Sequence, residues 1–241
     1  QVSGSVSVMA VALPNVGQPV TSELRTRLFV ERKQDLWSHI RFDTSAYVDT
    51  LVADRAVGTA RDAVVRPQEL YVEACSSRFD LRLGASRLVW GRLDEFQPTD
   101  VVNPIDLSRF LLEGRSEARL PVGLVRGRWF LPHATTLEGV LVPWFRRGRF
   151  DQLDESSSPF NLAPFPVPAP QGVQGGARLT STIGRVDVGT TVYRGIRAFP
   201  FYERFTMVGG DFETVRGEWG VRGELAAFDD DSVDAGVGID R

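Results

Sequence analysis

Residues 36–53 read LWSHIRFDTSAYVDTLVA, and apolar and polar side chains alternate along this stretch. The even positions are mostly apolar and include Ile40 and Phe42, whereas the odd positions carry Arg41 and Asp43 in the middle. A period of two places the two sets on opposite faces of a β-strand. The stretch therefore predicts a strand with one apolar face and one charged face.

The same alternation recurs along the chain and predicts an all-β protein of about 12 strands. The other expected strands cover 21–32, 68–75, 79–90 and 217–228, with weaker patterns at 2–13, 122–131, 136–145, 177–183, 186–196, 204–215 and 233–241. We expect a single domain over residues 1–241. A stretch rich in proline, serine and glycine predicts a long irregular loop at 151–176.

Composition removes several classes of function. The formal net charge of −3 gives no general attraction to nucleic acid. The single cysteine, Cys75, excludes an internal disulfide framework, and no Cys/His spacing indicates a metal site or a cofactor. No run approaches the roughly 18 apolar residues of a membrane-spanning helix. A membrane β-barrel still fits, because its apolar surface is hidden in the alternation.

Two architectures are compatible with the alternation. In a soluble sandwich the apolar face is a core and the charged face meets water. In an outer-membrane barrel the apolar face meets lipid and the charged face lines a wet interior. Strands of about 9–11 residues suit a membrane crossing, and large aromatic side chains near strand ends suit the membrane interface. These aromatic residues are Phe79, Trp90, Trp129, Trp144, Phe145 and Trp219.

The barrel interpretation assigns each face of the strands an environment. The side chains expected to meet lipid are Leu36, Ile40, Phe42, Val48, Leu81, Leu83, Val221 and Leu225. Those expected in the lumen or its constriction are Arg25, Arg27, Arg41, Asp43, Glu73, Arg82, Arg126, Arg128, Glu138, Arg222 and Glu224. Because buried charges are costly unless they are paired or wet, we expect the lumen residues to form ion pairs or contact water.

The stretch 67–114 carries an ordered series of motifs: an acid-bearing strand, a tight turn, a strand ending in W-G, and a loop with N-P-x-D. This series resembles an uncharacterised, porin-like family of Gram-negative outer-membrane β-barrel proteins. The matching residues are Glu69, Tyr71, Gly84, Trp90, Gly91, Asn103, Pro104 and Asp106. Ser86 departs from the pattern, since the family often has glutamine there. Later segments, 137–145, 188–195 and 210–226, resemble the family's following strands in order.

The resemblance implies an antiparallel up-and-down transmembrane β-barrel in the bacterial outer membrane, through which small solutes pass passively. It implies contact with outer-membrane lipid and lipopolysaccharide, and it leaves assembly into a homo-oligomer open. Such barrels usually end on a strand with a terminal aromatic residue. The chain instead ends VDAGVGIDR. We therefore expect a fragment that lacks C-terminal strands.

The segment 91–120 is expected to fold inward and narrow the barrel. The candidate residues of this loop, with the tryptophan directly before it, are Trp90, Gly91, Asp100, Asn103, Pro104, Asp106 and Arg109. The acids are expected to pair with lumen arginines such as Arg82 and Arg126. The alternative is an ordinary surface loop whose apolar residues pack on the rim.

Three functions remain open. The first is a passive channel for small solutes. The second is a transporter of hydrophobic compounds, with an apolar site of uptake at Phe110, Leu111, Leu112 and residues 159–170. The third is a soluble, secreted β-sandwich that acts as a binding module. An enzyme is not expected, because carboxylates such as Asp43 and Glu73 come without a nucleophile–base signature.

Overall fold

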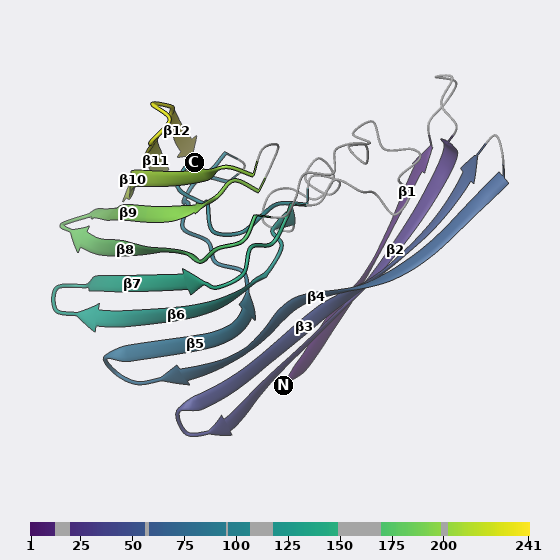
Figure 1. Ribbon diagram of the computed structural model, residues 1–241, viewed down its shortest axis with the longest axis horizontal. Helices are drawn as coiled ribbons and strands as arrows, with labels where there is room; N and C mark the ends of the chain where they lie inside the picture. Colours follow the sequence, from purple (N-terminus) through teal and green to yellow (C-terminus); the bar gives the residue numbers. More distant parts are fainter. Residues whose placement is uncertain (13–19, 56–57, 95, 107–117, 149–169, 199–201) are drawn as a thin grey trace.

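The computed structural model describes residues 1–12, 20–55, 58–94, 96–106, 118–148, 170–198 and 202–241. These residues form one sheet of 12 strands in the order of the sequence, and every neighbouring pair is antiparallel (Figure 1). The strands are β1 (Val2–Ala12), β2 (Val20–Trp37), β3 (Ile40–Arg55), β4 (Gly58–Cys75), β5 (Phe79–Ser86), β6 (Val122–Leu131), β7 (Thr135–Val142), β8 (Gln174–Ile183), β9 (Val186–Ile196), β10 (Arg204–Arg216), β11 (Trp219–Phe228) and β12 (Val233–Asp240). The predicted all-β meander is confirmed.

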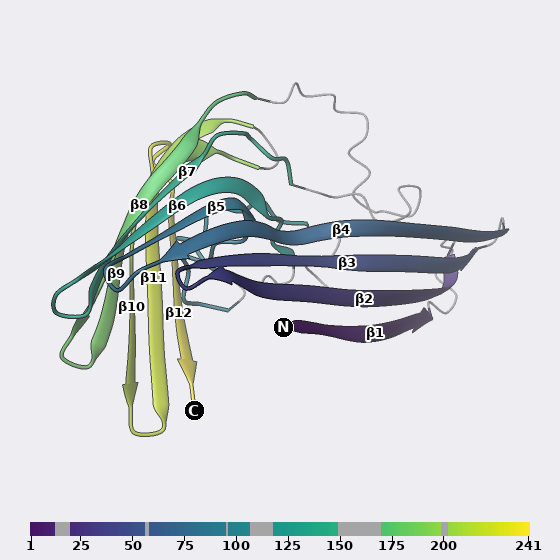
Figure 2. The ribbon, with the colours of Figure 1, turned by 90° about the horizontal axis from the view of Figure 1, so that it is seen from below.

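The sheet is strongly bent. Figure 2 shows β5–β12 as an arch, from which β1–β4 extend to one side. Among the described residues β1 and β12 are the two edges, so the sheet curves without closing. A sandwich would require two packed sheets, and the described chain forms one. In the same part of the chain, no helix is long and apolar enough to cross a membrane.

Several expected strand boundaries were wrong. The stretch 36–53 contains a turn at residues 38–39, so β2 ends at Trp37 and a new strand, β3, begins at Ile40. The pattern continues across this turn because two inserted residues leave a period of two unchanged. At the other boundaries, β5 ends at Ser86 rather than residue 90, β7 ends before Pro143, and β8 begins inside the expected loop 151–176.

The largest difference is β4, which begins at Gly58 instead of residue 68. Ser45 pairs with Glu69 whereas Ala46 pairs with Pro67, so Gln68 is an extra residue in a β-bulge. A bulge shifts the alternation by one position, which hides the strand from a search for period two. Proline has no backbone N–H to donate to a neighbouring strand. Pro67 is tolerated in β4 because β5 pairs with β4 only from Leu70 onward, so no strand of the described chain pairs with Pro67 on that side.

The apolar face of the sheet is its convex, outer face. Leu36, Leu83 and Leu225 are 42%, 47% and 53% exposed, and none of the eight side chains expected to meet lipid belongs to the buried core. Exposed apolar side chains in such number are typical of a surface that meets lipid or a partner. This arrangement contradicts a soluble fold in which these residues form the core.

The buried core lies on the concave side of the sheet, which we call the inner face. It joins Leu88, Trp90 and Val102, from the segment after β5, to side chains of the strands. The strand residues are Val122, Leu124, Val140, Val142, Tyr193, Phe205, Met207 and Ala226. The inner face is therefore partly apolar, which the alternation did not predict, because a segment of the chain covers it and excludes water.

Candidate functional site

Residues 87–106, which we call the inner loop, leave the end of β5 and cross the inner face toward β10–β12 (Figures 1 and 2). Glycines on the opposite wall make room for the inner loop. A Cβ atom at Gly236 would lie 2.7 Å from Leu93 Cδ1, and one at Gly209 would lie 2.8 Å from Thr99 Cγ2. The inner loop, which follows β5, therefore contacts β10 and β12 at the other end of the sheet order.

The Glu224 carboxylate on β11 anchors the inner loop. It accepts hydrogen bonds from the backbone N–H groups of Arg92, Leu93 (2.7 Å) and Thr99 (3.2 Å), and from the Thr99 hydroxyl (2.9 Å). Glu224 is 4% exposed. An ionised carboxylate has about four acceptor sites, so this one side chain can accept all four of these hydrogen bonds.

Arg92 ties the inner loop to β10. Its guanidinium donates to Asp211 and, at 2.9 Å, to Glu213. Asp211 is shared with Arg178 on β8, whose Nη1 lies 2.8 Å from Asp211 Oδ2. Burial would lower the pKa of Arg92, but the hydrogen bonds to the two acids raise it above its ordinary value. Arg92 therefore remains charged in this buried network.

Asn103 holds the two ends of the inner loop together. Its Oδ1 accepts from the Leu88 N–H at 2.7 Å, and its Nδ2 donates to the carbonyl oxygens of Leu120 (2.7 Å) and Ser86 (3.3 Å). Pro104 follows, which favours an extended backbone at Asn103. The asparagine of the N-P-x-D motif thus replaces the strand pairing that the chain loses after β5.

The acids of the inner loop form buried ion pairs. Asp100 Oδ2 lies 2.7 Å from Arg119 Nε, and Asp106 Oδ2 lies 2.7 Å from Arg66 Nη1. All four side chains are at most 8% exposed. Removing one partner of such a pair is expected to be strongly destabilising, because a buried charge is left without compensation.

The expected pairing of these acids with Arg82 and Arg126 was wrong. Both arginines bind Glu73 instead, at 3.1 Å and 2.7 Å. The sheet register explains this, because Glu73, Arg82 and Arg126 are consecutive cross-strand partners on one face. Arg109 lies outside the described residues.

The predicted lumen residues lie on the inner face, and most of them are paired there. The contacts are Arg25 with Glu23, Arg27 with Asp49, Arg41 with Asp35, Asp43 with Tyr71, Arg128 with Asp80, Glu138 with Trp90, and Arg222 with Asp94 and Asp240. Their role in permeation remains a prediction.

Sequence reasoning missed other members of the network. Arg178, Asp211 and Glu213 fall on the polar positions of strands that were expected, so the period of two could have identified them. Arg66 was hidden by the bulge in β4. Arg92 and Arg119 lie in segments without periodicity, and no local signal marks them.

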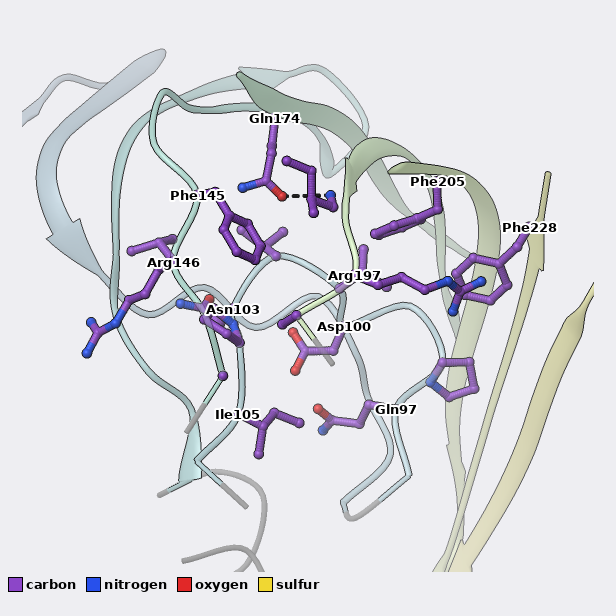
Figure 3. A pocket seen from close by; sticks show the side chains of 18 of the residues that line it. Gln97, Asp100, Asn103, Ile105, Phe145, Arg146, Gln174, Arg197, Phe205 and Phe228 are labelled. Carbon is purple, nitrogen blue, oxygen red and sulfur yellow. Dashed lines mark hydrogen bonds between the residues drawn. The ribbon is translucent and has the colours of Figure 1, made fainter. Parts of the chain in front are cut away.

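A pocket opens beside the inner loop, where it meets the ends of β8–β11 (Figure 3). Its volume is about 330 Å³. Val102, Ile105, Phe205 and Phe228 form apolar parts of its lining, and Gln174, Arg197 and Asp100 are among the polar parts. Within the described chain, no group of three or more His, Cys, Asp or Glu residues is placed to hold a metal ion.

The arrangement of strands is similar to that of solved porins. The OmpF porin of Salmonella typhi, in complex with daunomycin, matches 99% of this chain and 72% of its own, at 8% identity and a TM-score of 0.50. The chain has a porin-like fold. A triple mutant of the Rh. blastica porin matches 99% of this chain and 88% of its own, at 11% identity and a TM-score of 0.39. No protein-family model and no curated protein matches the sequence. At such low identity the similarity concerns the fold and does not extend to a ligand.

Proposed function

We propose that the protein is an outer-membrane channel for the passive passage of small solutes, and a member of the porin-like family whose W-G and N-P-x-D motifs it carries. One observation carries the proposal: charged side chains are gathered on the concave inner face, while the opposite face exposes apolar ones. A lipid-facing exterior around a polar lumen has this distribution. We propose a channel rather than an enzyme.

The proposal also gives a location and partners. The apolar face would contact outer-membrane lipid and lipopolysaccharide of a Gram-negative bacterium, and this face is also available for homo-oligomer contacts. Fractionation of cells tests the location. Recovery of the protein from the periplasm or medium without detergent would contradict it.

The inner loop is proposed to narrow the passage. Side chains beneath it are fully buried, as Tyr193 and Met207 show at 0% exposure, so solutes have no room there. Charges that stay accessible should instead set ion selectivity. Asp94 is such a residue, with a side chain that is 80% exposed beside Arg222. A confined passage of low dielectric constant strengthens the field of each such charge.

Planar-bilayer recordings test the channel. Purified protein should conduct ions, and a complete absence of current would contradict the proposal. In a salt gradient, Asp94→Asn should shift the reversal potential toward anion preference. Asp231→Asn is the matched control, since Asp231 is an exposed turn residue outside the strands with a φ of 63°, which asparagine adopts readily.

A second candidate, transport of hydrophobic compounds, is favoured by the apolar lining of the pocket beside the inner loop. The sites of uptake expected at Phe110, Leu111 and Leu112 lie outside the described residues, as do residues 159–169 of the segment 159–170. Liposome uptake distinguishes the two functions. A hydrophobic compound that enters much faster than a sugar of similar size would favour this candidate.

A further inference from the structure

The connections between strands at one rim of the sheet are uniformly short, and we call this the short-turn rim. They are residues 38–39, 76–78, 132–134, 184–185 and 217–218, and Figure 2 shows the β8–β9 and β10–β11 turns at the same end of their strands. The opposite rim carries the two longest connections, residues 87–121 and 143–173. Outer-membrane barrels have short turns on the periplasmic side and longer loops outside. In the proposed location, the short-turn rim therefore meets the leaflet that faces the periplasm.

Two large apolar side chains mark this rim on strands that lie close together. Ile183 ends β8 and is 66% exposed, and Trp219 begins β11 and is 51% exposed. Ile183 pairs with Val186 on β9, and Val186 pairs with Thr214 on β10. Trp219 pairs with Arg216, two residues farther along β10. Because tryptophan favours the boundary between hydrocarbon and water, these side chains mark the level of the lipid headgroups.

Two arginines lie beside these side chains. Arg185 is in the β8–β9 turn, where its carbonyl oxygen accepts the Thr214 hydroxyl at 3.0 Å. Arg216 is the cross-strand partner of Trp219 and shares its face of the sheet. Both arginines are exposed, and within the described chain neither guanidinium takes part in an ion pair or a hydrogen bond. Guanidinium groups at this level can reach a lipid phosphate and donate paired hydrogen bonds to it.

The acids around Trp219 leave these two arginines uncompensated. Three acids each have another arginine as partner: Glu218 with Arg241, Glu213 with Arg92, and Asp240 with Arg222. A fourth, Asp187, accepts the Thr182 hydroxyl at 2.6 Å and stands opposite Glu213 on the inner face. Arg241 also covers the Trp219 ring, with 5.6 Å between the guanidinium carbon and the ring centre. The outer side of the rim is therefore positively charged, which is complementary to an anionic headgroup.

We propose that the short-turn rim around Trp219 binds the headgroup of an anionic phospholipid. The lipid phosphate accepts hydrogen bonds from the Arg185 and Arg216 guanidinium groups, and the acyl chains lie along Trp219 and Ile183. The inference rests on the proposed outer-membrane location and deepens it, because it names the class of lipid and the place on the sheet that holds it.

Quenching of tryptophan fluorescence by brominated lipids tests the site in vesicles of equimolar phosphatidylcholine and phosphatidylglycerol. Trp37→Phe, Trp129→Phe and Trp144→Phe leave Trp219 together with Trp90, which is 2% exposed and out of reach of lipid. In this parent protein, phosphatidylglycerol with brominated acyl chains should quench Trp219 more strongly than brominated phosphatidylcholine. Adding Arg185→Gln and Arg216→Gln should lower the relative affinity for phosphatidylglycerol at least about fivefold, the effect of one arginine near an anionic surface.

Arg61→Gln with Arg194→Gln is the matched control, because both are exposed arginines near the ends of β4 and β9 at the opposite rim. The lipid preference at Trp219 should then equal that of the parent protein. Circular dichroism verifies that each variant is folded. Salt provides a second measurement that needs no substitution at the site: about 1 M shortens the Debye length to about 3 Å, so the preference of the parent protein should fall.

The outcomes separate the site from the proposed location. Equal quenching of the parent protein by the two brominated lipids would overturn the inference and leave lipid contact intact. An unchanged preference after Arg185→Gln and Arg216→Gln, or in high salt, would overturn it as well. Absence of quenching by either lipid would instead contradict the lipid-facing location on which the inference rests.

Discussion

Replacing Glu224 with alanine should detach the backbone of Arg92, Leu93 and Thr99 from β11 while the sheet stays folded. The substitution removes the acceptor of three backbone N–H groups, those of Arg92, Leu93 and Thr99, and of the Thr99 hydroxyl. Each buried donor left without a partner costs about 1–3 kcal/mol. Opening of the loop avoids this cost, because the freed N–H groups can then form hydrogen bonds with water.

Local opening of the inner loop limits the loss of stability that can be measured in this variant. The loop retains other anchors, including the Arg92 contacts with Asp211 and Glu213 and the clamp at Asn103. We take the lower limit of about 1 kcal/mol for each of the three unpaired amides. The free energy of local opening should therefore fall by about 3 kcal/mol. Each 1.4 kcal/mol is a factor of ten. The amides of Arg92, Leu93 and Thr99 should thus exchange with solvent about 100-fold faster.

Hydrogen exchange followed by mass spectrometry measures this effect on peptides that cover the inner loop. Glu218→Ala is the control, because Glu218 is an exposed acid that directly precedes β11. Its ion pair with Arg241 is exposed to solvent and contributes little to stability. Exchange of the inner loop in that variant should match the wild type. Unchanged protection of the three amides in Glu224→Ala would refute the anchoring argument. Equal acceleration across all strands would refute the claim that the loop opens independently of the sheet.

Two further predictions concern the two faces of the sheet. Phe42→Arg should destabilise the protein in lipid vesicles by about 2–4 kcal/mol if Phe42 lies near the bilayer midplane, as measured by urea unfolding; no change would contradict lipid contact. Gly209→Ala should displace the inner loop at a cost of about 1–3 kcal/mol, because the new Cβ would lie 2.8 Å from Thr99 Cγ2 and 3.0 Å from the Leu225 carbonyl oxygen. Gly139→Ala is its control, since a Cβ there meets nothing within 4 Å, and equal hydrogen exchange at Thr99 in both variants would disprove the close approach.

The sequence alone determined most of the strands and the sorting of their side chains. The alternation by itself assigns Glu73, Arg82 and Arg126 to one face, and they meet there across β4, β5 and β6. The reason is that strand alternation is local: a side chain's face depends on its position along its own strand and not on distant residues. The bulge at Gln68 marks the limit of this rule, since a single extra residue concealed ten residues of β4 and with them Arg66.

The path of the inner loop was decided only by the tertiary structure. Its main anchor joins Arg92 to Glu224 across 132 positions of sequence, and Arg92 also meets Asp211 and Glu213 on another strand. No periodicity relates such residues, because an irregular segment makes contacts that depend on where the bent sheet brings its strands. For the same reason the buried core around Trp90 and the pocket at Gln174 are invisible in the alternation: both exist where the loop covers strand residues that the pattern by itself assigns to an open, polar face.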